Sequence, residues 1–408
     1  MKRRHISITS CILFLAIFSC TKYPDPWITV DTCTFSETTG NATNPYTTLY
    51  QDILDDFVKS GIPGLSVAIK TPEYGWWVGC AGLASIEDKI AMRPCHLHNS
   101  ASMAKTYTAT MIMRLYEEGK LDLDDLASNY LSEDIVSGVA NADKVSIRQL
   151  LNHTSGMGAS YNSELRNIDF FNNPITDYSI DAHFEKYVYR QPAEAAPGEE
   201  YNYKDINYAL LGLIVENVSD MSIGDYLDQE IIEPLGLVNT YYWSSPGYPD
   251  RIPYLVNSYF ELFPGQIQNC TDISLSLRKS AIGFTGIYAS PYEFGRFVQE
   301  LMRGNIVDPG TLEIMLEDEQ INFEFRKYGL GIMHWHDIMD FDDSYGHAGG
   351  GRSSSSIMMY FPDTDVTVAF AYNLGMYFIS EKMESLHNDL TVELLSVTFF
   401  GERANLDE

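Results

Sequence analysis

The stretch Ser100-Ala101-Ser102-Met103-Ala104-Lys105 opens a long, mainly apolar segment that ends near Glu118, and it predicts the start of a buried helix. Residues three positions apart lie on one helical face, so Ser102 and Lys105 can reach each other by a hydrogen bond. A serine hydroxyl is a poor nucleophile at neutral pH, but a lysine of lowered pKa can take its proton. Lysine is rarely buried unless its charge is paired, so a lysine in a buried helix indicates a specific partner. The stretch therefore predicts a serine nucleophile paired with a lysine base.

Alone, this spacing is weak evidence, because Ser276-Leu277-Arg278-Lys279 repeats it and a capping serine with a solvated lysine is its ordinary interpretation. Two further segments strengthen it. Tyr203-Lys204-Asp205 lies in a loop before a predicted helix, where the phenol can serve proton transfer. The segment Gly346-His347-Ala348-Gly349-Gly350-Gly351 precedes a predicted hairpin. Its glycines allow a ligand close to the backbone, although a bulge or tight turn would also explain them.

Together the three segments resemble the serine penicillin-recognising enzymes, which include class C β-lactamases, D-alanyl-D-alanine carboxypeptidases and related esterases. Their motifs are S-x-x-K, a tyrosine-centred loop triad and a K-T-G-like strand triad. Other stretches that look like family signatures follow in family order: Gly61–Ala68, Glu118–Asp125, Ile147–Met157, Glu233–Leu237 and Tyr328–Gly331. The resemblance runs from about residue 47 to residue 400.

The resemblance implies a role for each matching residue. Ser102 would be the acylated nucleophile and Lys105 its base partner, while Tyr203 would pass a proton to the leaving group. His347 would stand where many family members have lysine. The backbone N–H groups of Ser102 and Gly350 would form the oxyanion hole, and Ala348 and Gly349 would contact substrate. No metal ion or organic cofactor is implied.

Two positions depart from the family pattern. Asp205 stands where the family has asparagine, and a carboxylate can only accept hydrogen bonds, so we expect it to pair with Lys105 and favour the charged ammonium. Ala348 stands where penicillin-binding members carry threonine or serine, so a hydroxyl that would hold the substrate's carboxylate is absent. The loss costs about 1.5–3 kcal/mol, which predicts weak or no β-lactamase activity. Arg352 could supply a replacement positive charge, although an ordinary surface arginine is the simpler interpretation.

β-rich segments lie near both ends of the chain and helical patterns lie between them. The strand-like runs are Leu65–Lys70, Trp76–Leu83, Ser355–Phe361 and Val366–Tyr372, and the helical segments are 47–60, Lys105–Glu118, Ser146–Asn152, Asn207–Val218, Ile223–Ile232, Pro291–Arg303 and Met376–Phe399. This order predicts an α+β fold, with an antiparallel sheet flanked by helices and a mainly helical inserted subdomain. With the resemblance, it predicts one β-lactamase/transpeptidase-like catalytic unit over residues 46–400. Residues 46–115 and 285–400 would form the sheet domain, and residues 116–284 the helical insert.

The N-terminus has the pattern of an export signal. A basic start, Met1-Lys2-Arg3-Arg4, precedes the apolar segment Cys11–Phe18, which is too short to span a membrane. Ile17-Phe18-Ser19-Cys20 resembles a bacterial lipobox, so we expect a signal peptide over residues 1–19, lipid on Cys20 and a tether over residues 20–45. The protein would then sit in the bacterial cell envelope, facing the periplasm or the exterior. An ordinary signal peptide with an incidental Cys20 is the alternative.

An oxidising envelope would allow disulfides. If Cys20 carries lipid, four further cysteines follow it, namely Cys33, Cys80, Cys95 and Cys270, and they allow three pairings. Cys80 and Cys95 flank a predicted hairpin and are the preferred pair. Four buried free thiols are the alternative.

Charge and the remaining histidines exclude some classes of function. The net charge of −29 repels nucleic acid and anionic lipid, so neither is an expected partner apart from the lipid anchor. His334 and His336 could share a strand face, but they lack the third ligand that zinc requires, so we predict no metal site. His153 is expected to fix its loop through hydrogen bonds rather than to take part in chemistry.

The residues and the family resemblance together imply a serine hydrolase that forms an acyl-enzyme on Ser102. The expected substrates are peptides that end in D-amino acids, among them peptidoglycan stem peptides, or small esters and amides. Because Asp205 and Ala348 could mark a decayed site, a catalytically silent binding or sensing module of the same fold is the rival hypothesis. Glycan binding by exposed aromatic side chains is a third.

Overall fold

The computed structural model describes residues 33–37, 39–158, 172, 179–243, 254–263, 265–276, 280–317, 320–323, 326–336, 341–351, 353–375 and 381–404. The predicted signal peptide, the lipid site Cys20 and Arg352 lie outside these residues. No helix in the described ranges is long and apolar enough to cross a membrane.

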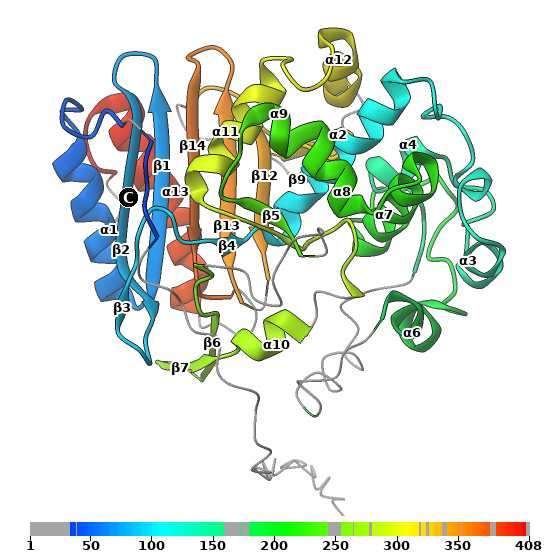
Figure 1. Cartoon of the computed structure of the whole chain (residues 1–408), viewed down its shortest axis with the longest axis horizontal. Helices are drawn as coiled ribbons and strands as arrows, with labels where there is room; N and C mark the ends of the chain where they lie inside the picture. The colour runs from blue at the N-terminus through cyan, green and yellow to red at the C-terminus, as the bar shows by residue number, and fades with distance from the viewer. Residues whose placement is uncertain are drawn as a thin grey trace, which may run out of the picture.

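One antiparallel sheet joins the two ends of the chain (Figure 1). Its described part has nine strands in the order β3-β2-β1-β14-β13-β12-β11-β10-β9. Leu65 on β1 lies opposite Tyr372 on β14, so an N-terminal and a C-terminal strand are neighbours at the centre, as the pattern of the sequence predicts. The strands are β1 (Gly64–Thr71), β2 (Gly75–Ser85), β3 (Ile90–Ala91), β9 (Gln320–Phe323), β10 (Arg326–Tyr328), β11 (Met333–Trp335), β12 (Ser344–Gly350), β13 (Ser355–Phe361) and β14 (Val366–Tyr372).

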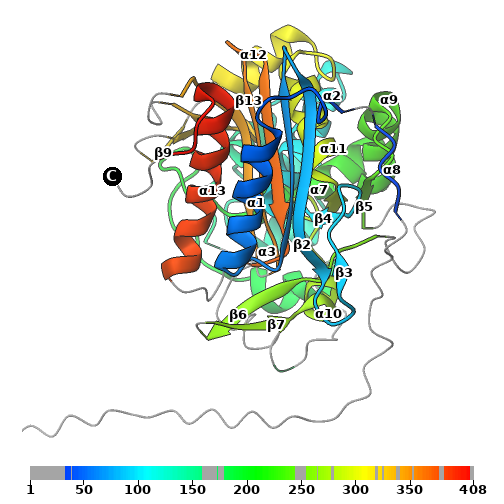
Figure 2. The same ribbon diagram turned by 90° about the vertical axis from the view of Figure 1, so that its left-hand side faces the viewer.

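Helices cover both faces of the sheet. The helices α1 (Thr47–Ser60) and α13 (Glu381–Phe400) lie side by side on one face, and α11 (Pro291–Met302) covers the other (Figure 2). Side chains of β13 alternate between the two cores: Ile357 and Met359 pack on the α13 side, whereas Met358 and Tyr360 pack on the opposite side. Because both of its faces are buried, β13 is apolar along its whole central part. This continuous apolar segment of the sequence is what predicts the strand.

The middle of the chain is mainly helical, as predicted, but it also contains short strands. Its central helices α2 (Ala104–Glu117) and α7 (Asp205–Ser219) pack against each other. The predicted helix at Ile223–Ile232 is α8 (Ile223–Leu227) followed by a π-helical turn. The other helices are α3 (Glu133–Gly138), α4 (Ile147–Leu151), α6 (Ile180–His183), α9 (Glu233–Leu235), α10 (Thr271–Ser276) and α12 (Pro309–Glu317), and the short strands are β4 (His98–Asn99), β5 (Thr240–Tyr242), β6 (Tyr259–Phe263), β7 (Gln266–Asn269) and β8 (Ile287–Ala289).

The tether prediction over residues 20–45 is wrong in its last part, because the chain already packs on the sheet before residue 45. The side-chain amide of Asn41 donates to Val78 O at 2.7 Å and accepts from Val78 N–H at 3.0 Å. Gly40 N–H donates to Trp76 O at 2.6 Å. These bonds satisfy backbone groups on the outer edge of β2 that the two-residue β3 leaves open.

The preferred disulfide, Cys80 with Cys95, is also wrong: Cys95 is bonded to Cys33, 62 positions earlier in the sequence. Cys80 lies on β2, and its thiol donates to Met92 O at 3.2 Å. The chain leaves the hairpin after β3, so Cys95 lies beyond it and meets the N-terminal segment instead. Cys80 and Cys270 remain thiols rather than disulfide-bonded.

Candidate active site

Ser102 lies in a tight turn between β4 and α2. Residues Ala101–Met103 form one 3₁₀ turn, which buries Ala101 and Met103 and leaves Ser102 partly exposed. Ala101 has φ of 45°, a left-handed conformation that costs an alanine about 1 kcal/mol. The side chain of Asn99 accepts the Ala101 N–H at 2.8 Å, and Ser356 on β13 donates to Ser100 O at 3.0 Å. The sheet therefore holds a strained turn that presents the serine.

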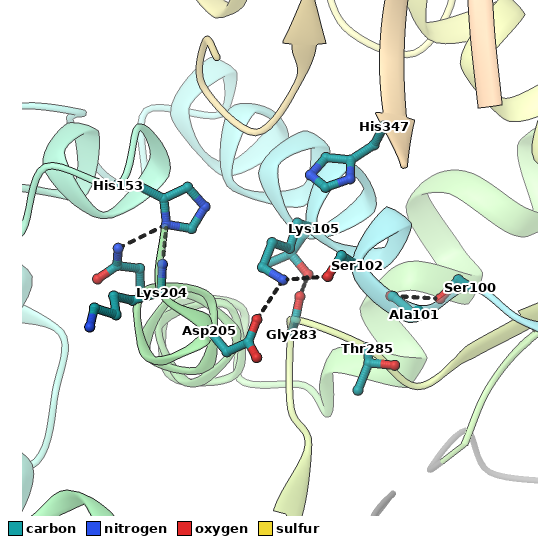
Figure 3. A network of polar contacts seen from close by, with 12 residues as sticks. Ser100, Ala101, Ser102, Lys105, His153, Lys204, Asp205, Gly283, Thr285 and His347 are labelled. Atoms are coloured by element: carbon teal, nitrogen blue, oxygen red, sulfur yellow. Dashed lines mark hydrogen bonds and ion pairs between the residues drawn. The ribbon is translucent and has the colours of Figure 1, made fainter. Parts of the chain in front are cut away.

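Lys105 occupies the position that its spacing from Ser102 predicts. Its ammonium is fully buried and donates to Ser102 Oγ at 3.0 Å and to Asp205 Oδ1 at 2.7 Å (Figure 3). Burial is the largest single influence and lowers the pKa of Lys105, but the charge and hydrogen bond of Asp205, together with the interactions with Tyr203, outweigh it, so the pKa is raised. The resting lysine is therefore charged, as the substitution of aspartate for the family's asparagine predicts.

Tyr203 lies over the same ammonium. Lys105 Nζ is 4.7 Å from the centre of the Tyr203 ring. Burial raises the pKa of Tyr203, although the nearby Lys105 charge opposes the rise, so the side chain is a neutral phenol. Its hydroxyl interacts with Lys105 and Ser102, but with no described residue does it make a hydrogen bond of good geometry. A neutral phenol in this place can give a proton but cannot serve as the resting base.

His153 anchors the loop that carries Tyr203 and Asp205. Its Nδ1 accepts the backbone N–H of Lys204 at 3.3 Å and bonds Asn207 Nδ2 at 2.9 Å (Figure 3). Its ring centre lies 4.2 Å from that of Tyr203. Burial holds the pKa of His153 well below its usual range, so the ring is neutral. These contacts give His153 the loop-fixing position expected of it.

His347 is buried and cannot replace a lysine's positive charge. Its Nδ1 lies 2.6 Å from Ala348 O, and a carbonyl oxygen only accepts, so we assign the proton to Nδ1. The Nε2 atom then accepts from the Tyr328 hydroxyl at 3.0 Å. Burial lowers the pKa of His347 to about 3, which leaves the ring neutral. The histidine therefore shapes the site next to Lys105 without adding charge.

The pairing of β12 fixes the direction of the Gly350 N–H, which is the second oxyanion-hole donor that the resemblance predicts. Gly351 N–H bonds Ser354 O on the side of β13. N–H directions alternate along a strand, so Gly350 N–H points to the other edge. The β11–β12 pairing covers only residues 344–346 of that edge, so no described strand pairs with Gly350 there.

Gly349 has a packing role as well as its predicted place in the site. A Cβ on this residue would lie 2.3 Å from Ser100 O and 2.4 Å from Ser356 Oγ. Only glycine therefore lets the turn that carries Ser102 approach β12 so closely.

Ala348 points away from the residues that surround Ser102. Along β12, His347 and Ala348 face opposite sides of the sheet, and Ala348 packs with the core on the α13 side. There it lines a cavity of about 230 Å³. The expectation that Ala348 contacts substrate thus depends on whether substrate reaches this cavity.

Sequence reasoning missed two residues that organise the site. Tyr328 holds His347, and Asn99 holds the turn before Ser102. Tyr328 belongs to a stretch already singled out for its family resemblance, and a polar residue three positions before the nucleophile was a usable signal for Asn99. His334 forms a hydrogen bond with Asp343. Among the described residues, no three potential metal ligands lie close enough together to hold a metal ion.

Known proteins resemble this chain in sequence. The sequence profile named Beta-lactamase matches residues 50–377. The chain belongs to the beta-lactamase family. One curated relative is protein flp of Staphylococcus aureus (strain COL), which is 29% identical to this chain over 185 residues. The aligned part is 45% of this chain and 36% of flp. N-acetylmuramyl-L-alanine amidase of Bacillus subtilis (strain 168) is 27% identical over 270 residues, 59% of this chain and 57% of the amidase. The chain thus spans between about a third and three-fifths of these relatives.

Solved structures share the fold. A D-stereospecific amidohydrolase from Streptomyces sp. superposes with a TM-score of 0.71 at 23% identity, over 87% of this chain and 99% of that one. D-amino acid amidase from Ochrobactrum anthropi SV3, in complex with L-phenylalanine amide, gives 0.72 at 22% identity over 87% and 99%. The octameric penicillin-binding protein homologue from Pyrococcus abyssi gives 0.71 at 22% identity over 88% and 78%. The predicted α+β, β-lactamase/transpeptidase-like fold is confirmed.

Proposed function

We propose that this protein is a serine hydrolase that forms an acyl-enzyme on Ser102. The observation that carries the proposal is the contact of a fully buried lysine with both a partly exposed serine and an aspartate. A protein that only binds its ligand has no need to bury a cation against a serine hydroxyl, which makes a nucleophilic role the simplest explanation.

The reaction starts when the Lys105 ammonium releases a proton to solvent water. Ser102 Oγ then bonds to the substrate's carbonyl carbon, its proton passes to the Lys105 amine, and the carbonyl oxygen takes the negative charge. The backbone N–H groups of Ser102 and Gly350 stabilise this oxyanion. When the tetrahedral intermediate collapses, the leaving group takes a proton from Tyr203, which regains one from Lys105. A water molecule then attacks the acyl carbonyl carbon and gives a proton to the Lys105 amine. When the second tetrahedral intermediate collapses, Ser102 Oγ leaves and takes that proton, which restores the serine.

Peptides that end in D-amino acids, D-amino acid amides and small esters are the proposed substrates. The folds of two D-amino-acid-specific amidohydrolases support this choice at the level of architecture. Because His347 is neutral and Ala348 lacks a hydroxyl, we expect slow β-lactam hydrolysis or none. A stem peptide of peptidoglycan would be a natural substrate of this class.

A substrate panel tests the proposal. The purified protein is assayed with a D-Ala-D-Ala peptide, D-phenylalanine amide, p-nitrophenyl acetate and a chromogenic cephalosporin, beside Ser102→Ala as control. We expect turnover of at least one of the first three that Ser102→Ala reduces by about 10³-fold or more. Turnover of none of the four, or equal turnover by Ser102→Ala, would favour the silent binding module.

We also propose that the protein is exported and anchored through lipid on Cys20. The Cys33–Cys95 disulfide supports an oxidising compartment. Expression of the full chain and of Cys20→Ser in a bacterial host, followed by detergent phase partitioning, tests the anchor. The full chain should enter the detergent phase and Cys20→Ser the aqueous phase. Equal partitioning of the two would refute lipidation.

A further inference from the structure

We propose that the cavity between α13 and the sheet is a second small-molecule site, which takes an uncharged, ring-bearing molecule with a hydroxyl group. The site belongs to the core on the face of the sheet that α1 and α13 cover (Figure 2). No step proposed for Ser102 uses this cavity, so the inference is independent of the hydrolase function.

The walls of the cavity are mostly apolar, and the space suits a ring. Its volume is about 230 Å³. Buried apolar side chains that line it include Trp335 of β11, Phe341, Met359 and Phe361 of β13, and Leu395 of α13. An engineered cavity of about 150 Å³ with walls of Leu, Ile and Phe binds benzene, so this larger one has room for an aromatic ring and a small substituent.

Two buried polar atoms in the lining lack a hydrogen-bond partner among the described residues: Ser344 Oγ and His387 Nε2. Ser344 is 1% exposed, and it lies opposite Trp335 in the β11–β12 pairing, so both side chains leave the sheet on the cavity face. His387 is 8% exposed, and its Nδ1 lies 3.2 Å from the Tyr372 hydroxyl, which leaves Nε2 as its polar atom in the cavity. Buried polar atoms without a hydrogen bond are costly, so both atoms call for a partner within the cavity.

A hydroxyl group is the partner that fits both atoms. Ser344 can donate or accept, whereas His387 Nε2 does one or the other, depending on which ring nitrogen carries the proton. A hydroxyl both donates and accepts, so it matches either form of the ring. Burial lowers the pKa of His387 to about 4, so the ring is neutral at pH 7. Arg326 and Asp342 contribute one charge of each sign to the lining, which favours an uncharged molecule.

A ligand can reach this cavity without passing the nucleophile. Asp342 and Asn388 line the cavity and are exposed, so it opens to solvent at these two residues. Ser102, Lys105 and Tyr203 are not among its described lining residues. Binding in the cavity can therefore be distinguished from binding at Ser102.

Phenol and toluene are a matched pair of probes for the site, because they are close in size and differ by a hydroxyl in place of a methyl group. Their affinities for the full chain are measured by calorimetric titration. We expect wild type to bind phenol with a Kd at or below about 1 mM, more tightly than toluene. Ser344→Ala and His387→Phe each remove one partner of the hydroxyl. Each should weaken phenol by roughly 2- to 10-fold and leave toluene within about twofold.

Ser66→Ala is the matched control. Ser66 is a buried serine of β1, and its hydroxyl also has no hydrogen-bond partner in the described part of the chain, but it does not line the cavity. Its replacement should leave the affinities for both probes unchanged. A fall in phenol affinity equal to that of Ser344→Ala would overturn the proposal.

A second measurement on the wild-type protein does not depend on the stability of the variants. With methionine labelled by ¹³C in its methyl group, the signal of Met359, assigned with Met359→Leu, should shift as phenol is added. No binding of phenol at up to about 10 mM would indicate a cavity that holds only water, and it would refute the site. Binding that leaves both the Met359 signal and the Ser344→Ala affinity unchanged would place phenol elsewhere and refute it equally.

Discussion

Replacement of Asp205 by asparagine separates the two effects of the Lys105–Asp205 ion pair. In the native protein Asp205 lies 2.7 Å from a fully buried ammonium and keeps it protonated. Asparagine retains the shape and a hydrogen-bond acceptor but removes the charge. Burial then lowers the pKa of Lys105 without the opposing negative charge of Asp205. The fraction of free amine at pH 7 rises by about tenfold for each unit by which the pKa falls.

The loss of the pair should destabilise the fold. Removing one partner of a buried ion pair costs about 3 kcal/mol at the lower end of the known range, which suits a site where the Asp205 side chain is 15% exposed. For a chain of 408 residues, an unfolding entropy of about 2.1 cal/mol/K per residue converts this loss into a melting temperature lower by about 4 °C. The surface pair of Lys204 and Glu194 provides the control, since Glu194→Gln should cost less than about 1 kcal/mol.

The assay is the rate at which a fluorophosphonate labels Ser102 between pH 6 and pH 10. In wild type the raised pKa of Lys105 makes the rate climb with pH through this range, because more free amine forms as pH rises. In Asp205→Asn the climb should move to lower pH, and labelling at pH 7 should be faster than in wild type. Identical pH profiles for two folded proteins would refute the assignment of Lys105 as the base.

Three further substitutions test the supports of the site. Cys33→Ser opens the disulfide to Cys95, and the 62-residue separation predicts a loss of about 4 kcal/mol in the free energy of unfolding by denaturant, whereas Cys80→Ser should change little. Gly349→Ala introduces a Cβ where no space exists, so Ser102 labelling should fall at least about tenfold in a protein whose far-ultraviolet circular dichroism is unchanged; normal labelling would contradict the close approach. His153→Phe keeps the ring but removes the acceptor for two N–H donors, so kcat should fall while KM stays within about twofold, and His153→Asn, which restores an acceptor, should recover part of kcat.

The features that could be predicted from the sequence are those set by neighbours in the chain. The bounds of α1, β13 and β14 follow from apolar periodicity and turn residues, and they agree with the structure residue for residue. The contact of Ser102 with Lys105 follows from helical spacing alone. The charged state of Lys105 followed from the chemistry of one substitution, because an aspartate can only accept a hydrogen bond.

The features that could not be predicted depend on where distant segments meet. The pairing of Cys33 with Cys95 requires the N-terminal segment to pack along β2, which no local pattern in residues 33–44 encodes. The neutral state of His347 depends on its burial against Tyr328, which comes from another strand. The direction of Ala348 depends on the register of β12 with β13, and a motif three residues long does not contain that information.

The most direct test of the account is to find the covalent intermediate itself. The wild-type protein is quenched in acid within milliseconds to seconds of mixing with a p-nitrophenyl ester or a D-amino-acid ester, digested and mapped by mass spectrometry. The account predicts the acyl group on Ser102 within the peptide that contains Lys105, with no acylated peptide in Ser102→Ala. Product release with no acyl group at any time point, or an acyl group on another residue, would contradict it.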